Sequence, residues 1–135
     1  MAATERTVHA RWLGGLKASV DAGGFPVVAD EPESVGGGGT APQPTELLLA
    51  SIASCFTIAL AHCAARRGTD LAGLQVDVTG HYDGPRFSAF RIDVHTDTPR
   101  GEELAGLIAA AERVCYVSRT LRSSPRIDIV AHGSG

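Results

Sequence analysis

Two segments in the second half of the chain alternate between apolar and polar residues. In "LQVDVTGHYD" (74–83) and "FSAFRIDVHTD" (87–97) the apolar side chains recur at every second position: Leu74, Val76 and Val78, then Phe90, Ile92 and Val94. The sequence "DGPR" between them is a turn signal. A period of two is typical of a half-buried strand, so the pattern predicts an antiparallel pair with one face on the core.

A long apolar segment, "PTELLLASIASCFTIALAHC", begins at Pro44. Proline suits the first helical turn, Glu46 complements the positive end of the helix dipole, and Gly68 after two arginines is a typical end signal. A helix is therefore predicted from Pro44 to about Arg67. Because it is apolar on nearly all sides, we expect it to be buried on most faces. One chain of 135 residues has little material to enclose it, so a second copy, and hence a homodimer, is expected.

Shorter elements precede and follow these segments. Strand-like runs within residues 8–20 flank Gly14 and Gly15, which predicts a hairpin, and "GFPVVAD" (24–30) adds a third strand. A loop rich in glycine and proline leads into the long helix. After the alternating pair we expect, in order, a helix over 100–114, a short helix from residue 116 and a last strand, "RIDIVAH" (126–132). This order predicts one α+β domain over residues 1–135, with helices on one face of a mostly antiparallel sheet.

Charge and cysteine content narrow the function classes. A net charge of −3 and a pI of about 5.9 argue against nucleic acid as a partner. The N-terminus has no apolar signal core, and polar residues interrupt the long apolar segment before Arg66 and Arg67 end it, which favours a buried helix over a membrane span. We therefore expect a cytoplasmic protein with no membrane partner. In that reducing compartment, three cysteines do not indicate a structural disulfide framework.

No motif indicates a metal or a cofactor. The run Gly36 to Gly39 lacks the Lys-Ser/Thr that follows a phosphate-binding loop, and we interpret it as part of a mobile loop. The cysteines and histidines do not have the spacing of zinc ligands. We therefore expect no metal and no bound cofactor.

The three cysteines occupy different settings. Cys55 and Cys63 are eight residues apart on one helix, about 12 Å in rise, so they cannot form a disulfide while the helix stands. Cys63 is interpreted as a core residue, and His62, about 10 Å from Cys55 along the helix, is too far to be its direct base. Cys115 precedes a short helix, whose dipole and free N–H groups lower the pKa of a thiol. Cys55 and Cys115 are thus either a pair that forms a disulfide across the fold or two inert core residues.

The residues around these thiols resemble a known family. "PTELLLASIASC" followed sixty residues later by "C-x-V-S-R-T-L" is similar to the OsmC/Ohr family of osmotically inducible and organic hydroperoxide resistance proteins. The "RW-x-GG" near the N-terminus and the glycine- and proline-rich loop before the long helix also fit. The resemblance spans nearly the whole chain, and it is closer to the general OsmC-like branch than to the dedicated hydroperoxide reductases.

The resemblance implies an intertwined homodimer with two long central helices wrapped by sheets from both chains. It also implies a thiol peroxidase that acts on organic hydroperoxides and needs no cofactor. Cys55 would attack the hydroperoxide and become a sulfenic acid, and Cys115 would resolve it as a disulfide. A dithiol, either a small thiol or a lipoylated protein, would then reduce the disulfide. The apolar surroundings favour fatty or aromatic hydroperoxides over hydrogen peroxide.

The resemblance is weaker at the groups that would activate Cys55. In the family an arginine, held by a glutamate near the start of the long helix, favours the thiolate; here Thr45 stands at the glutamate position and Glu46 follows it. Glu46 lies about 13 Å before Cys55 on the opposite helix face, so it can only approach the thiol of a partner helix. The candidate cations are Arg11, which we favour, Lys17 and Arg119. Tyr116 replaces the proline that often follows the family's resolving cysteine.

Three functions therefore remain open at this point. The leading one is the organic hydroperoxide reductase. The second, motivated by Thr45, is an OsmC-like binding protein for a small apolar ligand with little or no peroxidase turnover. In the third, Cys55 and Cys115 are core residues without chemistry.

Overall fold

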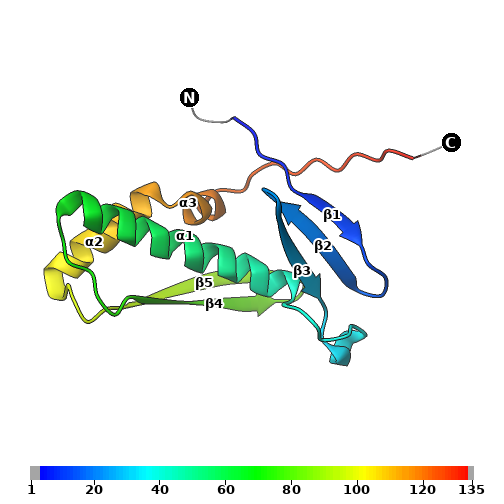
Figure 1. Ribbon diagram of the computed structural model, residues 1–135, viewed down its shortest axis with the longest axis horizontal. Coiled ribbons are helices and arrows are strands. Elements are labelled where there is room, and N and C mark those ends of the chain that lie inside the picture. The colour runs from blue at the N-terminus through cyan, green and yellow to red at the C-terminus, as the bar shows by residue number, and fades with distance from the viewer. Residues whose placement is uncertain (1–3, 134–135) are drawn as a thin grey trace. The chain divides into compact units, whose positions relative to one another are not determined.

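The computed structural model describes residues 4–133 and forms two compact units, Met1–Ala50 and Ser51–Gly135, which are described in turn. The first unit contains an antiparallel sheet of three strands in the order β1 (His9–Trp12), β2 (Lys17–Ala22) and β3 (Phe25–Asp30) (Figure 1). Gly14 and Gly15 both have positive φ in the turn between β1 and β2, which is the backbone freedom that the hairpin requires. The predicted hairpin and third strand are confirmed. That all of residues 1–135 form one domain stays a prediction.

The glycine-rich loop after β3 is held by a buried carboxylate. Asp30, only 2% exposed, accepts hydrogen bonds from the Thr40 hydroxyl at 2.6 Å, from the Thr40 N–H at 3.1 Å and from the Gly38 N–H at 3.3 Å. These hydrogen bonds hold the pKa of Asp30 below its usual value, and the bond from the Thr40 hydroxyl has the largest effect. A Cβ at Gly37 would collide with the Glu31 carbonyl, so the loop needs glycine there. The loop contains one short 3₁₀ helix, η1 (Glu33–Val35), and leads into α1 (Pro44–Arg67).

The second unit packs helices on one face of a two-stranded antiparallel sheet. It contains the part of α1 from Ser51 onward, then β4 (Gln75–Asp83), β5 (Arg86–His95), α2 (Gly101–Val114) and α3 (Tyr116–Arg122). In the β4–β5 pair Val76 lies opposite Val94, and Val78 lies opposite Ile92, as the alternation predicts. The predicted α+β class, with antiparallel sheets and three helices, is confirmed.

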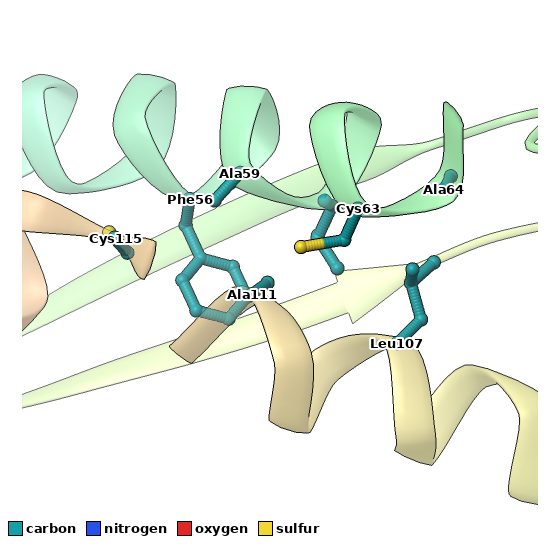
Figure 2. Close-up of a cluster of buried hydrophobic side chains, with 8 residues drawn as sticks. Phe56, Ala59, Cys63, Ala64, Leu107, Ala111 and Cys115 are labelled. Carbon is teal, nitrogen blue, oxygen red and sulfur yellow. The ribbon is translucent and has the colours of Figure 1, made fainter. Parts of the chain in front are cut away.

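The core of this unit forms where α1 meets α2 (Figure 2). Its buried residues come from the two helices and the link to α3: Phe56, Ala59, Leu60, Cys63, Ala64, Leu107, Ala111 and Cys115. Apolar residues of β4 and β5 pack against this cluster. In Figure 2 the side chains of Cys115 and Cys63 are separated along α1, with the Phe56 ring drawn between them. Cys63 is buried in the core, as the sequence predicts.

A single chain buries only one side of α1, so burial on most faces, which the sequence predicts together with a second copy, stays a prediction. The buried residues of α1 follow one another at spacings of one, three and four, from Ile52 to Ala64, and so form one stripe. Ile58, on another side of the helix, is 68% exposed. By length and composition alone α1 is apolar enough to cross a membrane, a test that core helices of soluble proteins also pass. One chain therefore covers only one side of this helix.

The last predicted strand, over 126–132, is wrong. In the described part of the chain, residues 124–133 are in no helix or strand, and no backbone hydrogen bond joins them to another segment. Ile127 and Ile129 alternate with polar residues but are 83% and 94% exposed. Alternation gives a segment the preference for a strand, but a strand also needs a neighbouring edge to pair with, and no strand edge in residues 4–133 pairs with this segment.

Candidate active site

Cys55 and Cys115 come together in the second unit. Cys55 lies in the middle of α1, and Cys115 is the single residue that joins α2 to α3. The Cys115 side chain is fully buried, while Cys55 is partly exposed and packs against the cluster that contains Cys115. The two side chains interact, since Cys55 is one of the groups that lower the pKa of Cys115. Neither thiol is in a disulfide. The fold thus brings together two free cysteines that are sixty residues apart in the sequence.

The surroundings of Cys115 favour its thiolate. Burial raises the pKa of the Cys115 thiol, but hydrogen bonding from the side chain and N–H of Ser118, from the Cys55 side chain and from the Val117 N–H outweighs burial, and the pKa lies below its usual value. The Cys115 side chain does not form a capping hydrogen bond at the start of α3. The pKa of Cys115 is nevertheless lowered, as predicted for a thiol at a helix start.

A pocket of about 790 Å³ opens beside Cys55. Its lining comes from all three helices: Cys55, Ile58, Ala59, His62, Arg113, Val114, Tyr116, Arg119 and Thr120. The wall is largely apolar, and its large side chains are not covered by the rest of the chain, with Tyr116 84% and Val114 46% exposed. The pocket thus gives a small organic molecule a way to approach the Cys55 sulfur.

Of the three candidate cations, the structure brings Arg119 to this pocket. Arg11 and Lys17 belong to the first unit, where Arg11 is an exposed residue of β1 opposite Ser19 and Lys17 begins β2. Their roles beside the thiol stay predictions. Arg119 follows Cys115 by one turn, and its N–H donates to the Cys115 carbonyl at 3.1 Å.

Glu46 has a defined place at the start of α1. Its Oε1 accepts a hydrogen bond of 3.0 Å from the Gln43 N–H, which is the side-chain half of a capping box. This carboxylate therefore stabilises the first turn of the helix, in agreement with its position near the positive end of the dipole. A catalytic role for Glu46 stays a prediction.

Sequence reasoning assigned Cys55 and Arg119 to the site but not the other residues that line the pocket, among them His62, Arg113 and Tyr116. His62 was placed too far from Cys55 to be its base, but its spacing of seven residues does put it on the same helix face. Arg113 lies two residues before Cys115, a proximity that the sequence shows but that does not reveal which way the side chain points. Within residues 4–133, no three His, Cys, Asp or Glu side chains gather in a way that suits a metal ion.

Comparisons with known proteins agree with this architecture. The sequence profile of the OsmC-like protein family matches residues 36–130. No curated protein matches the chain. Among solved structures, a provisionally assigned osmotic stress induced and detoxification response protein from Psychrobacter arcticus is similar, with 24% identity, a TM-score of 0.74 and coverage of 88% of this chain and 90% of that one.

Two further structures are similar over comparable lengths. An organic hydroperoxide resistance protein OsmC from Legionella pneumophila has 25% identity, a TM-score of 0.68 and coverage of 90% of this chain and 92% of that one. An organic hydroperoxide resistance protein from Elizabethkingia anophelis, with thiocyanate bound, has 24% identity, a TM-score of 0.63 and coverage of 87% and 89%. The family profile covers most of the sequence, including both cysteines that meet beside the pocket, and the chain belongs to the OsmC-like protein family.

Proposed function

We propose that this protein is a thiol-dependent peroxidase that reduces organic hydroperoxides. The observation that supports this most directly is the meeting of Cys55 and Cys115, a partly exposed thiol at a pocket and a buried thiol whose pKa is lowered. Two core residues without chemistry would need neither the pocket nor the helix-start surroundings of Cys115. Relatives named as organic hydroperoxide resistance proteins agree with this substrate class.

The proposed chemistry balances in three steps. The Cys55 thiolate attacks one oxygen of the hydroperoxide, the O–O bond breaks, and the departing alkoxide takes a proton, so that a Cys55 sulfenic acid and an alcohol form. The Cys115 thiolate then attacks the sulfenic sulfur, which forms a disulfide and, with one proton, releases water. A dithiol, either a small thiol or a lipoylated protein, reduces the disulfide and is itself oxidised to a disulfide. The apolar wall of the pocket receives the organic group of the substrate.

The experiment that tests this proposal counts thiols. The reduced protein, with three cysteines per chain, is mixed with cumene hydroperoxide, and free thiols are titrated before and after. We expect two thiols to be lost, and mass mapping to find a Cys55–Cys115 disulfide with Cys63 still reduced. Unchanged thiols after exposure to excess hydroperoxide would exclude the proposed chemistry.

The proposed assembly is a homodimer in the cytoplasm, whose reducing environment would regenerate the thiols. Two features support a second copy, which would then border the pocket beside Cys55: the side of α1 that one chain leaves uncovered, which includes the pocket residue Ile58, and the extended segment 124–133 without a paired edge. An apolar surface of this kind is typical of an interface. Sedimentation equilibrium should give twice the chain mass of 14.0 kDa, and a monomer at micromolar concentration would contradict the dimer.

A second candidate function is a binding protein for a small apolar ligand with little or no turnover. Two observations favour it: Thr45 stands where the resemblance expects an acid, and the neighbouring Glu46 is engaged in capping α1. Native mass spectrometry of the purified protein distinguishes the two candidates. A co-purified ligand together with thiols that resist hydroperoxide would support the binding protein and exclude the enzyme.

A further inference from the structure

The Phe56 side chain lies next to the two thiols but has no part in the proposed chemistry. Phe56 follows Cys55 directly in α1, so the two side chains leave the helix about 100° apart. Cys55 lines the pocket of about 790 Å³, whereas Phe56 is only 2% exposed and does not line that pocket. The ring instead borders a separate cavity of about 190 Å³, together with residues of β5, α2 and α3. The helix therefore turns the thiol toward one opening and the ring toward another.

The Phe56 ring packs at the corner where α2 meets α3. Cys115, which forms this corner, is fully buried in the same cluster as Phe56, and Cys55 packs against that cluster. Ser118, whose side chain interacts with Cys115, lines the second cavity together with Phe56. Figure 2 shows the ring reaching from α1 toward Ala111, which lies one turn before Cys115 on α2. The ring is thus in a position to support the corner from the side away from the Cys55 pocket.

The size of the ring matters because its neighbours are small. Phe56 is the one aromatic residue in the described cluster, and the residues nearest to it in Figure 2, Ala59 and Ala111, are alanines that cannot fill the space of a ring. A cysteine side chain has three staggered rotamers, and a disulfide requires one that points toward its partner. Without the ring, Cys115 could turn into the space that the ring leaves.

The same ring separates Cys115 from the third thiol. Cys63 belongs to the buried cluster and follows Phe56 by seven residues, which is two turns along the same helix face. In Figure 2 the Phe56 ring lies between the side chains of Cys115 and Cys63. The packing around the ring therefore leaves Cys115 with Cys55 as its neighbouring thiol.

We propose that Phe56 is a positioning residue that holds the Cys115 thiol toward Cys55 and so sets the effective concentration of one thiol at the other. The inference rests on the proposed function for the pairing of the two thiols and adds the residue that keeps them aligned. Because the ring does not line the pocket that receives the substrate, the chemistry stays with Cys55 and Cys115.

The test measures how readily the two thiols form a disulfide, without any hydroperoxide. The protein is equilibrated with mixtures of glutathione and glutathione disulfide, and mass mapping quantifies the Cys55–Cys115 disulfide. Two protein thiols lose two protons and two electrons, and glutathione disulfide is reduced to two molecules of glutathione. We expect Phe56→Ala to lower the effective concentration at least about tenfold, which raises the reduction potential of the pair by about 30 mV.

Two further variants control for a general loosening of the core. Phe56→Leu keeps much of the apolar volume but loses the ring, so it should show a smaller loss in the same direction, and it carries the test if Phe56→Ala does not fold. The matched control is Leu107→Ala, which also shortens a buried side chain of the same cluster, 1% exposed. Leu107 lies eight residues before Cys115, about 12 Å along α2, so its variant should lose thermal stability but keep the effective concentration within about twofold.

The outcomes separate this inference from the peroxidase proposal. A folded Phe56→Ala protein, or a folded Phe56→Leu protein where alanine is not tolerated, with the wild-type effective concentration would overturn the inference. An equal loss in Leu107→Ala would overturn it as well, and so would a wild-type protein that forms no Cys55–Cys115 disulfide in the glutathione mixtures. A loss confined to the Phe56 variants would support the inference even if the protein reduced no hydroperoxide.

Discussion

Replacing Cys55 with serine is expected to lower the rate of organic hydroperoxide reduction at least about a thousandfold. The reason is chemical: a serine hydroxyl is not ionised at neutral pH, and no seryl counterpart of the sulfenic acid can continue the cycle. Cys55 is also the one cysteine among the three that lines the pocket, so no other thiol can take its place there. Consumption of cumene hydroperoxide in the presence of excess dithiol measures the effect.

The matched control for this variant is Cys63→Ser. It makes the same chemical change on the same helix, but at a residue buried in the core away from the pocket. Placing a hydroxyl in that apolar cluster should lower the free energy of unfolding by about 1–3 kcal/mol and leave the peroxidase rate largely unchanged. A Cys55→Ser protein that is folded and consumes hydroperoxide as fast as the wild type would refute the proposed role of Cys55.

Local sequence patterns correctly predicted the helices and strands whose formation depends mainly on their own residues. The alternation of apolar residues in β4 and β5 reports one buried face, and the structure has this face against the helices. The start of α1 at Pro44 and its end before Gly68 follow from proline, the acid at Glu46 and glycine, which act over a few residues. Each of these signals is complete without knowledge of the rest of the fold.

One untested prediction and one wrong prediction concern surfaces that a single chain does not cover. The all-round apolarity of α1 was interpreted as burial with the help of a second copy, and one chain buries only the stripe from Ile52 to Ala64. The alternation of Ile127 and Ile129 was interpreted as a strand, yet no edge of this chain pairs with it in the described residues. In both cases the sequence contains the preference, and one chain does not supply the partner that would satisfy it.

The candidate site was predictable in part. The sequence placed Cys115 at a helix start and Cys55 within a helix, and the resemblance paired them, but only the fold shows that their side chains meet. The pocket could not be predicted, because residues of three helices line it and periodicity within one helix does not report its neighbours. Arg113 belongs to α2 and Tyr116 to α3, so their shared surface follows from the turn at Cys115.

Replacing Cys115 with serine is expected to separate the first turnover from the following ones. Cys55 and the pocket are unchanged in this variant, so one equivalent of hydroperoxide should still be reduced, and a sulfenic acid should remain on Cys55. The steady-state rate should fall at least about a hundredfold, because an external thiol must now replace one held beside the sulfenic acid in the fold. Rapid mixing with limiting hydroperoxide measures the burst, and labelling with dimedone detects the sulfenic acid.

The Ser118→Ala variant tests the same step without removing the thiol. Ser118 supplies the largest contribution that lowers the pKa of Cys115, so its loss should raise that pKa and reduce the thiolate fraction at any pH below it. As the pH falls, the rate of disulfide formation should therefore begin to decline at a higher pH in the variant than in the wild type. The rates of the two proteins should converge at alkaline pH, where Cys115 is ionised in both. A Cys115→Ser protein that sustains the wild-type rate through many turnovers, with no sulfenic acid trapped, would show that Cys115 does not resolve Cys55.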